Sequence, residues 1–203
     1  MARQTTQPQV SPQNTQPENT QPHVSPQLPT PNPQPPNPQT LAALYRPADS
    51  APATWSMNSL FQQLLSAGES GGSLGLSLVT QPPGIATPLH RHTREAEAFF
   101  LLDGSMTYRA GDETFHLSPG DFIWLPMGLP HAFRVTGPSP VRFLGLTTPG
   151  ALMTLYDEVG MPATERRLPD GDGRPMDEEI ARWNEIGPRY GLQVLGPPLP
   201  EES

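Results

Sequence analysis

Three histidines and one glutamate are the side chains of this sequence best suited to chemistry. His90 and His92 are separated by one residue, Glu97 follows five residues later, and His131 lies farther along the chain. Side chains alternate between the two faces of a strand, so a histidine pair at this spacing on a strand directs both imidazoles to one face. A third histidine and a carboxylate converging on that face would complete a metal site with three nitrogen ligands and one oxygen ligand.

Composition excludes several classes of protein. The 203 residues contain no cysteine, which rules out disulfides, zinc ribbons and a thiol nucleophile. A net charge of -8 without a basic stripe argues against nucleic-acid binding. No apolar run approaches the roughly 18 residues of a membrane span, and the N-terminus lacks the apolar segment of a secretory signal. We therefore expect no membrane partner and a cytoplasmic location.

Composition also divides the chain. Residues 1–40 consist mainly of Pro, Gln, Thr and Asn, with repeats of T-Q-P. Such a segment buries too little apolar surface to offset the entropy lost on ordering, so we expect a disordered tail with polyproline-II character. A PxxP-type ligand at residues 26–38 is the alternative, but no basic residue flanks it. The remaining length is enough for one domain with a real core.

Short strands separated by turn residues dominate the middle of the chain. Residues 55–67 fit a helix better than paired strands, although their spacing alone does not decide. The Asp103-Gly104 dipeptide is a hairpin signal. A turn about every ten residues indicates an antiparallel sandwich or small barrel, over a domain of residues 41–149. The expected strands span residues 73–80, 96–102, 105–109, 113–117, 122–125, 131–135 and 141–147.

The C-terminal part, residues 150–203, changes to helical spacing. Residues 150–159 form the first expected helix, with Gly160 beyond its end. A second helix from Asp177 to about Ile186 begins with acids at the positive end of its dipole. Residues 191–195 are expected to add a short edge strand.

Two motifs resemble those of the cupin superfamily. The first, G-x5-H-x-H-x4-E-x6-G, runs from Gly84 to Gly104, and the second, G-x5-P-x-G-x2-H-x3-N, starts at Gly120 and departs from the pattern only at its end, where Val135 replaces Asn. The resemblance implies an all-β fold, a double-stranded β-helix or jelly-roll barrel, with the short helical extension at its C-terminal side. It also implies one divalent transition metal (Fe, Mn, Ni, Co or Cu) bound by His90, His92, Glu97 and His131.

The resemblance assigns roles to nearby residues as well. The x4 spacing of the motif favours Glu97 over Glu95 as the ligand, which would leave Glu95 at the rim of the site. His116 lies outside both motifs and is expected to be structural or exposed. The glycines of each motif are expected to bracket a hairpin and to bring His131 beside the strand of His90 and His92.

Side chains two residues apart on a strand share a face, so the positions of the ligands predict which residues surround the metal. Phe99 and Leu101 share a face with Glu97, and Phe133 and Val135 share one with His131. An apolar, aromatic substrate pocket would suit a flat hydrophobic molecule. The alternative is that these four side chains belong to the plain barrel core.

Residues 90–104, 120–134 and the R-Y-G-L-Q-V-L-G-P-P-L segment at 189–199 are similar to single-domain bacterial cupins of the quercetin dioxygenase-like type. That resemblance implies an enzyme that opens an aromatic heterocycle with O2, with Glu97 taking the substrate hydroxyl proton, and a small aromatic or enolic substrate. Another metal-cupin enzyme, such as an isomerase or a different ring-cleaving oxygenase, and a non-catalytic binding module remain alternatives. By analogy with other single-domain cupins we expect a homodimer, with residues 41–80 as the candidate contact.

Overall fold

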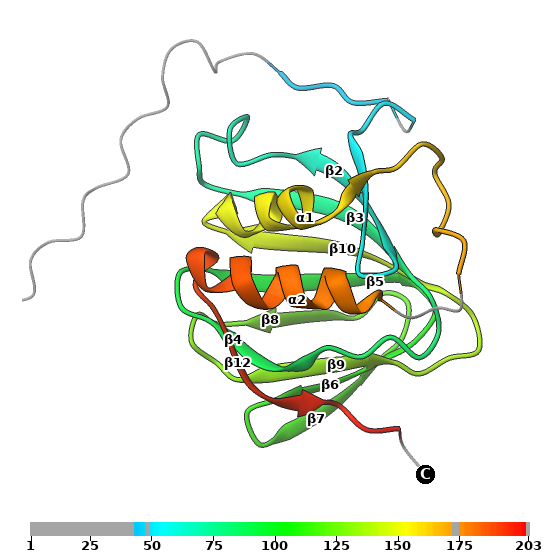
Figure 1. The fold of residues 1–203 in the computed structure, drawn as a ribbon, viewed down its shortest axis with the longest axis vertical. Coiled ribbons are helices and arrows are strands. Elements are labelled where there is room, and N and C mark those ends of the chain that lie inside the picture. The colour runs from blue at the N-terminus through cyan, green and yellow to red at the C-terminus, as the bar shows by residue number, and fades with distance from the viewer. Residues whose placement is uncertain (1–42, 48, 172–174, 202–203) are drawn as a thin grey trace, which may run out of the picture. The chain divides into compact units, whose positions relative to one another are not determined.

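A computed structural model describes residues 43–47, 49–171 and 175–201, and the expected disordered tail at 1–40 lies outside these ranges. Two antiparallel sheets face each other (Figure 1). The large sheet has, in spatial order, β11 (Met161–Pro162), β1 (Ala53–Ser56), β2 (Ser59–Leu65), β3 (Gly75–Gln81), β10 (Val141–Thr148), β5 (Ala96–Asp103) and β8 (Phe122–Leu125). The small sheet has β12 (Leu192–Pro198), β4 (Pro88–His92), β9 (His131–Val135), β6 (Met106–Ala110) and β7 (Glu113–Leu117). The all-β jelly-roll expectation is confirmed.

The core lies between the sheets and follows the period-two pattern of the strands. Every second residue of β3 and of β10 is buried, because alternate side chains point toward the opposite sheet. Burial of each large apolar side chain contributes about 1.5–3 kcal/mol. The largest buried side chains of this core include Leu101, Met106, Tyr108, Leu125 and Phe143.

The helix favoured at residues 55–67 is wrong, because this segment forms a hairpin of β1 and β2. Ser56 pairs with Ser59, so the turn consists of Met57 and Asn58 alone. Both turn residues have positive φ, at 50° and 56°, which is the geometry of the two-residue turn that matches the twist of paired strands. The apolar residues that looked helical are packed against the core at Leu60 and Phe61.

The predicted hairpins around the motif glycines are also wrong, because the chain crosses between sheets at these points. β4 belongs to the small sheet and β5 to the large one, and the Asp103-Gly104 turn leads from β5 back to β6 in the small sheet. Gly104 adopts φ 82°, and a Cβ there would lie 2.9 Å from the Cα of Val141. Glycine is therefore required by the crossing between sheets.

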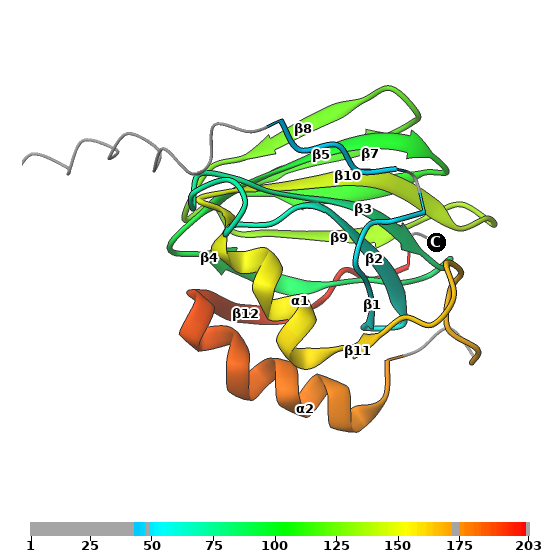
Figure 2. The same cartoon turned by 90° about the horizontal axis from the view of Figure 1, so that it is seen from above.

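The C-terminal part supplies the two expected helices and the expected strand β12, together with the two-residue strand β11. A 3-10 turn, η2 (Gly150–Leu152), leads into α1 (Met153–Val159), and α2 (Asp177–Ile186) leads through η3 (Gly187–Tyr190) into β12. In both views α1 and α2 lie side by side along one side of the two sheets, next to β12 (Figures 1 and 2). A second apolar cluster joins α1, α2 and β12 through Leu152, Leu155, Val159, Ile186 and Leu192.

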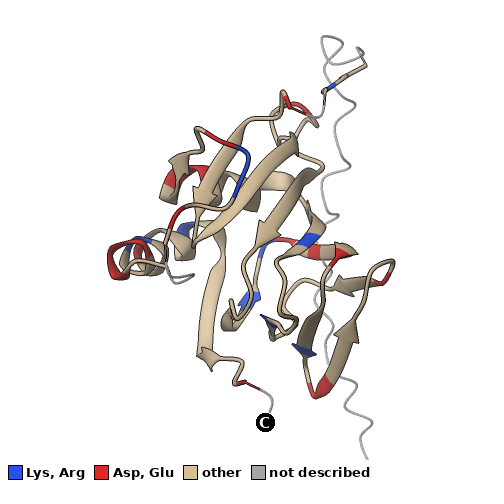
Figure 3. Cartoon of the chain, turned by 90° about the vertical axis from the view of Figure 1, so that its right-hand side faces the viewer, with Lys and Arg blue, Asp and Glu red and all other residues tan. Residues whose placement is uncertain are grey.

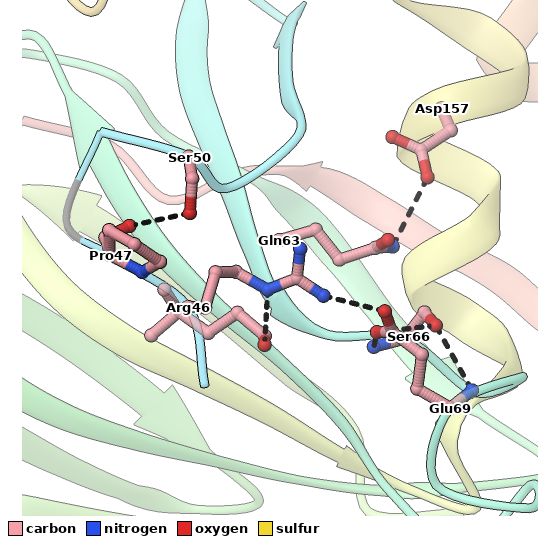
Figure 4. Close-up of polar contacts among 8 residues, drawn as sticks. Arg46, Pro47, Ser50, Gln63, Ser66, Glu69 and Asp157 are labelled. Carbon is pink, nitrogen blue, oxygen red and sulfur yellow. Dashed lines mark hydrogen bonds and ion pairs between the residues drawn. The ribbon is translucent and has the colours of Figure 1, made fainter. Parts of the chain in front are cut away.

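Hydrogen bonds connect α1 to the β1–β2 hairpin. The Asp157 carboxylate accepts hydrogen bonds from Thr54 Oγ1 at 2.8 Å and from Gln63 Nε2 at 3.2 Å, the second of which is drawn in Figure 4. At the far end of β2, Arg46 forms an ion pair with Glu69 at 2.6 Å. The position of α1 over the sheets is therefore set by both packing and hydrogen bonds.

Charged residues lie on many separate elements. Arginines are scattered over the described part of the chain, while acids concentrate in the first turn of α2 at Asp177, Glu178 and Glu179 (Figure 3). Among the described residues, no helix is both long and apolar enough to cross a bilayer.

Candidate metal centre

Neighbouring strands of the small sheet bring the three histidines together. His90 and His92 lie on β4, and the register of β4 with β9 places His131 directly opposite His90. Glu97 comes from β5 of the opposite sheet. The site therefore bridges the two sheets, and no single hairpin contains it.

The four side chains converge on one point. Each offers a ligand atom, and these atoms lie within 4.8 Å of one another. Glu97 Oε2 is 3.1 Å from His131 Nε2 and 3.2 Å from His92 Nε2. His92, Glu97 and His131 are buried, and His90 is partly exposed to the adjoining cavity.

Each imidazole is oriented by an acceptor at its other nitrogen. The Nδ1 atoms lie 2.7 Å from Pro88 O for His90, 3.1 Å from Glu95 Oε1 for His92, and 2.9 Å from Leu129 O for His131. An Nδ1–H donated to these oxygens leaves the Nε2 lone pair free for a metal. Three oriented imidazoles and one carboxylate fit a divalent first-row transition metal.

Glu95 does not lie at the rim of the site, where the sequence placed it. Its side chain is 2% exposed and accepts a hydrogen bond from His92. The x4 spacing of the motif indicates which carboxylate is the ligand, but it does not show where the side chain of Glu95, just before the first residue of β5, lies. Glu95 is a buried residue that orients a candidate ligand.

Burial and mutual charge shift the pKa values in this cluster. Burial first, and then the neighbouring His131 and His92, lower the pKa of His90 to about 4. Burial opposes charge on His92, but the Glu97 and Glu95 carboxylates outweigh it and raise its pKa to about 10. Burial likewise opposes charge on Glu97, yet His92 and His131 hold its pKa well below the ordinary value. The carboxylate is therefore ionised and attracts a cation, either a proton on His92 or a metal ion.

A cavity of about 340 Å³ adjoins the four side chains and runs between the sheets. Of the four residues expected to line a pocket, Phe99 and Phe133 do so. Leu101 and Val135 are 1% and 2% exposed and pack within the barrel core. His116, outside the motifs, is exposed on β7 and lies within hydrogen-bonding distance of Thr107 Oγ1, at 3.1 Å.

Much of the cavity wall comes from residues outside the motifs. Tyr156 of α1 stacks on Phe61 with ring centroids 4.0 Å apart, and Trp183 of α2 meets Tyr156 edge-on at 5.2 Å. All three side chains line the cavity, together with Gln81 from the end of β3. Helical spacing in the C-terminal part was the available signal for Tyr156 and Trp183, but it does not indicate which side of the sheets the helices cover.

Comparison with known proteins agrees with the fold and the motifs. Residues 77–147 match the family described as "Cupin domain", and this range contains all four candidate ligands. A quercetin 2,3-dioxygenase of Bacillus subtilis is 31% identical over 100 residues, covering 49% of this chain and 29% of the relative. A dimethylsulfoniopropionate lyase of Ruegeria pomeroyi is 38% identical over 63 residues, 30% of this chain and 31% of the lyase. The chain thus spans well under two thirds of the length of these relatives.

Solved structures with a similar fold include a predicted oxalate decarboxylase from Thermotoga maritima. Its TM-score is 0.47 at 22% identity, over 52% of this chain and 98% of that one.

Proposed function

We propose that this member of the cupin superfamily is a metal-dependent dioxygenase that opens an aromatic heterocycle of an enolic substrate, as a quercetin dioxygenase does. The observation that carries the proposal is the junction of the four-ligand cluster with a cavity walled by aromatic side chains. Such a cavity accepts a flat apolar molecule, and the ligand cluster lies at its polar end.

The metal would be held by His90, His92, Glu97 and His131. A divalent ion there would supply Lewis-acid stabilisation of a substrate enolate and a site for O2 chemistry. Glu97 is ionised and presents Oε2 to the two imidazoles, and its other oxygen would accept the hydroxyl proton of the substrate. Phe99 and Phe133 would hold the aromatic rings beside it, and the buried walls would exclude water.

The test mixes metal-reconstituted protein with quercetin in air and follows the flavonol absorbance and dissolved O2 together. Loss of both signals with Fe, Mn, Co, Ni or Cu, at least 100-fold faster than with Glu97→Ala, is the expected result. Equal rates in the two proteins with every metal would refute the dioxygenase.

An O2-independent reaction on an enolisable small molecule is the second candidate. Two observations favour it. The chain is similar to a lyase over 63 residues, and the hydroxyl of Tyr156, which can donate a proton, lines the same cavity as Glu97. Burial first, and then the Glu97 and Glu95 charges, raise the pKa of Tyr156 above its ordinary value, which keeps the phenol protonated as a donor. Substrate conversion at an unchanged rate under anaerobic conditions would identify this class.

A further inference from the structure

A polar side chain of the cavity has a buried acceptor with no hydrogen-bond partner among the described residues, and the metal cluster does not explain it. Gln81 ends β3, is 6% exposed and lines the cavity. Its Oε1 is buried and accepts no hydrogen bond from any residue that the structure describes. A buried acceptor without a partner is unfavourable by about 1–3 kcal/mol, so a glutamine at this position calls for an explanation.

Strand register separates Gln81 from the metal cluster. Glu97 pairs with Thr147 of β10, whereas Gln81 pairs with Val141 at the opposite end of the same strand. At roughly 3.3 Å per residue, these two pairs are about 20 Å apart along β10. Gln81 therefore belongs to the end of the cavity remote from the ligands.

The surroundings of Gln81 make the carboxamide stand out. The cavity residues nearest to it in sequence and across the paired strands are apolar: Val79, Ile85, Ala86 and Phe143. An apolar ligand end would fit these walls but would leave the carboxamide unsatisfied. A ligand end that carries a hydroxyl or N–H group would satisfy it.

We propose that the Gln81 carboxamide is a specificity-determining contact, which selects aromatic substrates with a hydrogen-bond donor at the end remote from their metal-binding oxygens. The inference rests on the proposed function for the metal-binding end of the substrate. It adds a class of substrate: a two-ended molecule with an enolic head, an aromatic body and a hydroxylated tail. A site that hydrogen-bonds a substrate hydroxyl rejects the analogue without it, because the polar group of the site is then left unpaired.

The test compares 3-hydroxyflavone with its 4′-hydroxy derivative on the metal-loaded full chain, without O2, by titration calorimetry. Wild type should bind the hydroxylated compound about 5- to 10-fold more tightly, as expected for one neutral hydrogen bond. Gln81→Met keeps the volume of the side chain and removes both polar atoms. This variant should bind the two flavones with about equal affinity. Gln62→Met on the neighbouring strand β2, where Gln62 pairs with Leu78 and does not line the cavity, is the matched control and should keep the preference.

Thermal unfolding of the free proteins separates recognition from a structural role. Gln81→Met should melt at or above the wild-type temperature, because an apolar side chain replaces an acceptor that has no partner. A melting temperature lowered by more than that of Gln62→Met would show that Gln81 supports the barrel, and would overturn the inference.

The remaining outcomes distinguish this inference from the dioxygenase. Equal preference in wild type and Gln81→Met, or no preference in wild type, overturns the inference even if flavonols are consumed in air. A preference that Gln81→Met abolishes, without consumption in air, supports the inference and refutes only the dioxygenase. Binding of neither compound refutes the substrate class and this inference with it.

Discussion

Replacing Glu95 tests whether the metal centre depends on a residue that does not itself bind the metal. Glu95 Oε1 lies 3.1 Å from His92 Nδ1, and its side chain is 2% exposed. Without this acceptor, the Nδ1–H of His92 is buried with no partner and water cannot replace it. The cost of an unsatisfied buried donor is about 1–3 kcal/mol, and loss of such an orienting partner typically lowers metal affinity about 10- to 100-fold.

Two variants of Glu95 should lower the metal affinity to different extents. Glu95→Leu removes the acceptor and should weaken metal binding about 100-fold. Glu95→Gln keeps a carbonyl oxygen that can accept from Nδ1 but loses the negative charge, so about 10-fold is expected. Competition against a chromophoric chelator measures both affinities. Glu113→Gln on β7, an exposed carboxylate whose strand is separated from that of His131 by β6, serves as the control.

The result that would refute the reasoning is specific. If Glu95→Leu binds metal as tightly as wild type, the orientation of His92 does not depend on Glu95. If Glu95→Gln loses metal as completely as His92→Ala, then Glu95 is a ligand and the assignment of Glu97 fails.

Three further predictions concern protons, packing and the C-terminal strand. The pKa of His92 is raised to about 10, so at pH 8 a metal ion must displace the proton on this imidazole. Calorimetry in buffers of different ionisation enthalpy should find about one proton released per metal ion bound, and the metal affinity should rise with pH. Metal binding without proton release would contradict this prediction. Gly150→Ala should lower the free energy of unfolding in urea by about 2–3 kcal/mol, because the added Cβ would lie 2.4 Å from the backbone carbonyl carbon of Leu74. Gly68→Ala is the control and should change the free energy of unfolding little, because the nearest atom to its added Cβ is 3.9 Å away. Arg134→Met removes the two hydrogen bonds that Arg134 donates to Leu199 O, at 2.9 and 2.7 Å. Amide hydrogen exchange in β12 should become at least threefold faster, because about 1 kcal/mol of local stability is lost. Unchanged exchange would show that β12 does not depend on Arg134.

The sequence predicts strands best where one face is buried and turn residues mark both ends. Residues 113–117, 122–125 and 131–135 match β7, β8 and β9 residue for residue, and α2 begins at Asp177 as expected. The β1–β2 hairpin was missed because its turn uses Met57 and Asn58 in place of glycine, so no local signal interrupted the apolar spacing. The hairpins expected at the motif glycines were wrong for another reason: a glycine marks a reversal, but not whether the chain returns to the same sheet.

The candidate site was predictable in its centre and less so around it. The spacing of His90, His92, Glu97 and His131 specified the residues that the fold gathers within 4.8 Å. The burial of Glu95 and the position of Gln81 depend on contacts between sheets, which period two along one strand cannot show. The aromatic contribution of Tyr156 and Trp183 depends on how the C-terminal helices dock, which is a tertiary property.

The pairing of β12 with β4 has a consequence for the order of events during synthesis. Leu192 lies opposite His92, and Val194 opposite His90, so the strand that carries half of the candidate ligands gains its outer partner from the final stretch of the barrel. On the ribosome, residues 90–131 emerge long before residue 198. In a nascent chain, the outer edge of the histidine strand would therefore stay unpaired until translation has passed β12, and a stable metal-loaded cavity is expected to form only after that point.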